Sequence, residues 1–95
     1  MYAVTVAFRL RPGNRPRFMP LMIENARLSR QIEDGCQHFD ICCGDDPDEL
    51  FLYEIYDDKQ AFANHLESEH FKAFDAAVAD MIDHKEVKLF DEVIR

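Results

Sequence analysis

The chain has 95 residues, 47% of them hydrophobic, and its formal net charge is −8. This length predicts one domain, residues 1–95. The negative charge argues against a nucleic-acid partner, which needs a basic surface, and against adsorption to an anionic membrane. The chain has no apolar run of membrane-spanning length and no basic segment followed by a long apolar one, so we expect a cytoplasmic protein.

The first part of the chain predicts a strand, a helix and a hairpin. The first segment alternates and is rich in Val, Phe and Tyr, as is typical of a strand. A helical stripe follows, and Asp34-Gly35 ends it, since glycine tolerates a positive φ. Two strand-like segments then flank an acidic turn. The expected elements are strand Tyr2–Leu10, a helix from about Arg17 to Glu33, and strands Cys36–Cys43 and Leu50–Tyr56.

The remainder predicts two helices and a last strand. Ser68 resembles an N-cap, so we expect it to separate a short helix, Lys59–Glu67, from a longer one, Glu69–Ile82. Apolar residues alternate from Val87 to Ile94, which predicts the final strand. The order β-α-β-β-α-α-β predicts an α+β, ferredoxin-like fold with an antiparallel sheet.

The strand Leu50–Tyr56 is apolar on both faces, although helices can cover only one of them. A second copy of the chain would cover the other face and would supplement the small core of a short domain. We therefore expect a homodimer.

Glu54 interrupts this apolar strand, and burying an unpaired carboxylate costs several kcal/mol or raises its pKa. His65 lies on the apolar side of the predicted short helix. A carboxylate that orients an imidazole is a common general acid/base pair, so Glu54 and His65 are candidate catalytic residues. The competing interpretation is a buried pair that only satisfies two polar groups.

Two further polar residues are candidate substrate ligands. His70 begins a helix, where the helix dipole favours a neutral imidazole; it could contact substrate or simply pack against the sheet. Asn25 lies beside the apolar stripe of the first helix, where its amide could hold an oxyanion or only face solvent.

Spacing argues against a metal site. His65 and His70 are five residues apart, with a helix break expected at Ser68, so they should not share an ion. Cys42 and Cys43 are adjacent on a strand and should point to opposite faces. The three cysteines are expected to be reduced thiols. Aromatic residues could line a pocket, although most should be core; these are Phe39, Tyr53, Tyr56 and Phe71.

The order of these residues resembles the antibiotic-biosynthesis-monooxygenase-like family across nearly the whole chain. The matching motifs are Glu33-x-Gly35-Cys36, Phe39-Asp40, Glu54-x-Tyr56-x-Asp58, Ala61-x-x-x-His65 and Ser68-x-His70-Phe71-Lys72-x-Phe74. Within the family the chain is most similar to the branch that contains the isomerase degrading phosphorylated autoinducer-2, which shares a Tyr-Glu-x-Tyr strand.

The resemblance implies a homodimeric α/β barrel and an enzyme acting on a small molecule. The first expectation is a cofactor-independent monooxygenase for a phenol, quinol or polyketide-like ring. An alternative is an isomerase of a small phosphorylated diketone, for which Lys72, Arg27 or Arg30 would bind the phosphate. Another is a ligand-binding dimer without catalysis. We expect no cofactor; haem is disfavoured because Asp75 occupies the helix region where haem-degrading relatives carry a His and the chain has no Trp.

Overall fold

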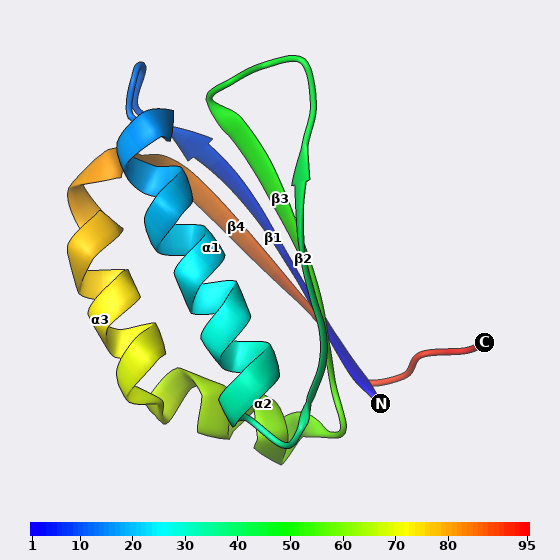
Figure 1. Cartoon of the computed structure of the whole chain (residues 1–95). Coiled ribbons are helices and arrows are strands. Elements are labelled where there is room, and N and C mark those ends of the chain that lie inside the picture. Colours follow the sequence, from blue (N-terminus) through cyan, green and yellow to red (C-terminus); the bar gives the residue numbers. More distant parts are fainter.

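The computed structural model, which describes all 95 residues, is a four-stranded antiparallel sheet with its helices packed on one face (Figure 1). The order of elements confirms the predicted α+β, ferredoxin-like arrangement. The elements are β1 (Tyr2–Leu10), α1 (Arg15–Ile32), β2 (Cys36–Cys43), β3 (Glu49–Tyr56), α2 (Lys59–Glu67), α3 (Glu69–Val78), a 3₁₀ turn (Ala79–Met81) and β4 (Ile82–Phe90).

The strands lie in the order β2-β3-β1-β4, and β2 and β3 pair as the predicted hairpin. The register places Glu54 between Phe39 of β2 and Val4 of β1. Because side chains on opposed residues share a face, the carboxylate of Glu54 lies among apolar neighbours on the helix-covered side.

Capping side chains fix the two short helices near that carboxylate. Asp58 accepts a hydrogen bond from the backbone N–H of Ala61 at 2.8 Å and begins α2. Ser68 accepts one from the N–H of Phe71 at 3.2 Å and begins α3, as predicted. The chain therefore changes direction between His65 and His70.

Three predictions on the path of the chain were wrong. The helix expected from Glu69 to Ile82 ends at Val78, and a 3₁₀ turn and the start of β4 take its remaining residues. The final strand begins at Ile82 and ends at Phe90, so Val93 and Ile94 lie outside it. The beginning of this strand was not predicted because residues 83–86 are polar. They belong to an edge strand that is mostly open to solvent. Gly35 does not take a positive φ; only Gly13 does. At Gly35 an added Cβ would lie 2.5 Å from the Cβ of Ala61, so the position needs a residue without a side chain.

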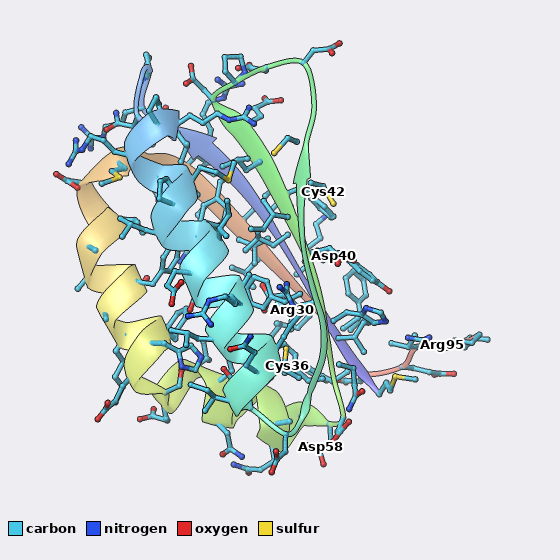
Figure 2. The ribbon with its side chains drawn as sticks, viewed as in Figure 1. Arg30, Cys36, Asp40, Cys42, Asp58 and Arg95 are labelled. Carbon is cyan, nitrogen blue, oxygen red and sulfur yellow. The ribbon has the colours of Figure 1, made fainter.

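The core lies between the helices and the sheet, and the opposite face of the sheet is bare (Figure 1). On that open face Phe51 is 42% exposed and Tyr53 is 36% exposed. Figure 2 shows Asp40 and Cys42 on the same side, away from α1. None of the helices has the length and hydropathy needed to cross a membrane.

Candidate functional site

A cavity of about 310 Å³ lies between the sheet and the helices α2 and α3, and we call it the helix-side cavity. Its lining is mainly apolar and comes from all three helices and all four strands. A hollow of about 500 Å³ also lies on the other side of the molecule, around the ion-paired Arg9, Asp46 and Glu49, and contains none of the predicted site residues.

Three buried polar side chains line the helix-side cavity: Asn25, Glu54 and His65. Asn25 is only 3% exposed, and its Oδ1 is sealed from solvent without a hydrogen-bond partner. An orphaned amide oxygen in an apolar hollow costs free energy, so it indicates a group that a ligand completes.

Glu54 is also 3% exposed, and its Oε1 accepts a hydrogen bond from the hydroxyl of Tyr56 at 2.6 Å. Burial raises the pKa of Glu54 to about 7, and it outweighs the hydrogen bond from Tyr56 and the charge of His65, which both lower it. The same burial, with the nearby Glu54 carboxylate, raises the pKa of the Tyr56 hydroxyl far above its ordinary range. Near neutral pH Glu54 can therefore both accept and release a proton.

The predicted hydrogen bond between Glu54 and His65 is not formed. Nδ1 of His65 lies 2.8 Å from Oε2 of Glu33, at the end of α1, and Nε2 of His70 lies 2.6 Å from the same oxygen. The sequence predicted the orienting carboxylate on the strand, but Glu33, the residue that follows α1, supplies it. Glu33, His65 and His70 form a group that we call the Glu33 cluster.

The protonation of the Glu33 cluster follows from its partners. Burial alone would raise the pKa of Glu33, but hydrogen bonds and charge from His65 and His70 outweigh it and lower that pKa. An ionised carboxylate only accepts hydrogen bonds, so His65 donates from Nδ1 and His70 from Nε2. Nε2 of His65 has no partner in the protein and is not among the polar atoms sealed from solvent. This nitrogen is thus available to a ligand in the helix-side cavity.

Ser29 connects the cluster to Asn25. Its hydroxyl donates to the backbone carbonyl of Asn25 at 2.8 Å, and its Oγ lies 3.4 Å from Nδ1 of His65 and 3.2 Å from Nε2 of His70. Because the hydroxyl proton is donated to this carbonyl, the lone pairs of Oγ face the two imidazoles.

Aromatic rings surround the imidazole of His65. The ring centroids of Phe71, Tyr56 and Phe39 lie 5.0, 5.6 and 5.9 Å from that of His65. Phe39 and Phe71 also line the helix-side cavity, whereas Tyr56 reaches it only through Glu54. Two of the four expected aromatic residues, Phe39 and Phe71, therefore form the wall, with Phe62 as an additional member at 6.2 Å from His65, whereas Tyr53 lies on the opposite face of the sheet.

The sequence profile of the family described as "Antibiotic biosynthesis monooxygenase" matches residues 1–77. The chain belongs to this family. No curated protein matches the sequence.

Solved structures of other proteins share the whole fold. A Nitrosomonas europaea protein assigned to the family by its name is 26% identical, with 99% of this chain and 100% of that chain covered and a TM-score of 0.92. Rv0793 of Mycobacterium tuberculosis is 27% identical, with 99% and 96% covered and a TM-score of 0.90. PA3566 of Pseudomonas aeruginosa, at 18% identity, covers 98% and 94% with a TM-score of 0.89 and supports the fold alone.

Lys72, expected to bind the phosphate if the protein is an isomerase, lies at the surface. Its side chain is 60% exposed, pairs with Glu67 at 3.2 Å and does not line the helix-side cavity. Arg27 is likewise held at the surface by Glu24. The cationic residue that does line the cavity is Lys85 of β4, and Asp75 of α3 lines it as well.

Two features of the site escaped sequence reasoning. Glu33 continues the buried stripe of α1 four residues after Ser29, a signal that the amphipathic pattern contained. The five-residue spacing does not keep His65 and His70 apart, because the turn at Ser68 brings both rings onto Glu33. His70 thus lies in the cluster and does not line the cavity as a substrate ligand.

Proposed function

We propose that this family member is a cofactor-independent monooxygenase that oxidises a small phenol- or quinol-like ring in the helix-side cavity. One observation carries the proposal: an apolar hollow of about 310 Å³ contains an orphaned amide, a carboxyl group with a pKa of about 7 and a free imidazole nitrogen. Apolar walls suit a flat ring, and the polar groups suit its hydroxyl groups.

Glu54 acts as the base in this proposal. It removes a proton from one ring hydroxyl, and Oδ1 of Asn25 or Nε2 of His65 accepts a hydrogen bond from the other. The electron-rich phenolate reduces O₂, a carbon–oxygen bond forms on the ring, and the proton returned by Glu54 completes a hydroperoxide. Loss of water then leaves a carbonyl group. Overall, a hydroquinone and O₂ give a hydroxyquinone and water, with all four electrons supplied by the substrate.

The alternatives have less support. An isomerase of a phosphorylated diketone needs cations at its phosphate. Lys72, Arg27 and Arg30 are engaged elsewhere, which leaves Lys85 as the single cation lining the cavity. A binding protein without catalysis does not require a carboxyl group with a pKa close to 7 beside its ligand.

Oxygen uptake with a panel of hydroquinones tests the function, with autoxidation subtracted. The Glu54→Gln variant should lose about 10²- to 10⁴-fold in turnover while binding the ring with similar affinity. Glu92→Gln, the same change at an exposed position of the tail, is the matched control and should keep full turnover. Absence of uptake by the unaltered protein with every hydroquinone would refute the proposal. Equal oxygen uptake by Glu54→Gln would show that Glu54 is not the base.

We also propose that the partner of the chain is a second copy, packed on the open face of the sheet. The exposed side chains Phe51, Tyr53 and Phe90 support this, since apolar groups gathered on one face favour association. Two sheets packed face to face would form the α/β barrel expected from the sequence.

A further inference from the structure

We propose that the Glu33 cluster binds one first-row divalent transition ion, with Zn²⁺ as its simplest representative. This inference goes beyond the oxidation proposed for the helix-side cavity and does not depend on it. It concerns the side of the His65 ring that carries Nδ1, whereas the cavity reaction uses Nε2.

The chemistry and positions of the donors carry the inference. Glu33, His65 and His70 each offer one ligand atom, and these atoms all lie within 4.8 Å of one another. Two imidazoles and one carboxylate form a donor set that zinc and related ions favour. An ion about 2.1 Å from each donor would need them roughly 3.4 Å apart, so the present oxygen–nitrogen distances of 2.6 and 2.8 Å would lengthen by less than about 1 Å.

Two further oxygen atoms are available to complete the coordination shell. The second carboxylate oxygen of Glu33, Oε1, is buried without any hydrogen-bond partner. Oγ of Ser29 lies 3.2 and 3.4 Å from the two imidazole donors and directs lone pairs toward them. A bidentate Glu33, or Ser29 or a water molecule, can thus supply a fourth ligand.

The surroundings are suited to a cation. A hollow of about 390 Å³ leads to Glu33 and is also lined by Asp34, Asp57 and Asp58, without any Lys or Arg. The net charge of −8 strengthens the negative potential at this entrance. The cluster itself is shielded, since the side chains of His65, His70 and Glu33 are 3%, 9% and 12% exposed.

An ion in this place would act on the helix-side cavity through one ring. Without metal, Nδ1 of His65 donates to Glu33, so in the neutral ring Nε2 is an acceptor. An ion bound to Nδ1 moves the proton of the neutral ring to Nε2, which then becomes a donor. Occupancy would therefore reverse the hydrogen-bonding character of the nitrogen that faces a ligand.

The test is a titration of the tag-free full chain with Zn²⁺ against a chromophoric chelator, after removal of metals by dialysis. We expect one ion per chain. His70→Ala should weaken binding at least about 100-fold, beyond the typical effect of residues outside the ligand shell. His84→Ala, on β4 and outside the cluster, is the matched control and should leave affinity and stoichiometry unchanged. The double variant Cys42→Ser/Cys43→Ser removes the exposed thiols and should also bind normally.

Co²⁺ absorption in the unaltered chain and anomalous scattering from a Zn²⁺-soaked crystal keep the test decisive if His70→Ala fails to fold. The expected results are a tetrahedral visible spectrum and one peak between Nδ1 of His65 and Nε2 of His70. No saturable binding overturns the proposal. So does binding that survives in a folded His70→Ala, binding lost with the cysteines, or a peak at another place.

Discussion

The hydroxyl of Tyr56 donates a hydrogen bond to Oε1 of Glu54 at 2.6 Å, between two side chains on the same face of β3. The bond reaches a carboxyl group that burial has shifted to a pKa of about 7. It stabilises the ionised form, so Tyr56 moderates a pKa that would otherwise be higher. The tyrosine ring packs near His65, and its hydroxyl tunes the proposed base.

Tyr56→Phe should raise the pKa of Glu54 above about 7, because the variant loses the donor that favours the carboxylate. The side-chain carboxyl ¹³C signal of Glu54, followed through a pH titration by NMR, measures this directly. Tyr53→Phe removes a hydroxyl from the opposite face of the same strand and should leave the midpoint unchanged. A midpoint that falls or stays constant in Tyr56→Phe would show that the bond does not favour the ionised form.

Glu54 should make the protein less stable as the pH rises. Its pKa is about 7 in the folded chain against 4.5 for an ordinary glutamate, so the folded state binds more protons between these values. Its contribution to the free energy of unfolding is therefore complete below pH 4.5 and lost as the pH rises through 7, by up to about 3 kcal/mol.

Urea unfolding at pH 4.5 and pH 8 checks this sign. Glu54→Gln cannot ionise, so its stability relative to the unaltered protein should improve from the lower to the higher pH by as much as about 3 kcal/mol. The exposed Glu92→Gln should show no such trend. A relative stability that is constant, or that worsens with pH, would contradict the assigned shift.

Much of the fold follows from short-range patterns, whereas the site depends on long-range contacts. Alternation and capping residues predict β1, the hairpin of β2 and β3, and the break at Ser68. The final strand was misplaced because its polar residues are supported only by pairing with β1. Glu54 was correctly expected to be buried, but its partner Tyr56 is two residues away in sequence while His65 meets Glu33 across 32 positions. Sequence spacing cannot distinguish between two carboxylates that both lie near one imidazole.

Gly35→Ala should destabilise the protein by about 1–3 kcal/mol, because the added methyl group would lie 2.5 Å from the Cβ of Ala61 and force α2 to move. Gly44→Ala is the matched control, since no atom lies within 4 Å of its added Cβ. Thermal unfolding of both variants checks the prediction. Similar melting temperatures would mean that the approach of α2 to Gly35 is looser than the structure indicates.

Phe51→Asp should convert a dimer into a monomer, because it puts a charge into the apolar face proposed to bind the second copy. Ile23→Asp is the control: Ile23 is 53% exposed on α1, on the side of the molecule away from that face. Sedimentation at micromolar concentration should give a dimer for the unaltered chain and for Ile23→Asp. A monomeric unaltered chain, or a dimeric Phe51→Asp, would argue against packing through the sheet.

Asn25→Leu should stabilise the protein and abolish oxygen uptake. The amide of Asn25 is buried with an unpartnered Oδ1, which carries a desolvation cost of about 1–3 kcal/mol that an apolar side chain of similar size avoids. Ser29→Ala, one turn further along α1, provides the contrast: its hydroxyl is bonded at 2.8 Å, so its loss should destabilise the protein. Urea unfolding combined with oxygen uptake separates the two roles. A less stable Asn25→Leu would show that the amide supports the fold. A more stable variant without oxygen uptake would show that the amide lowers the stability of the fold and serves binding.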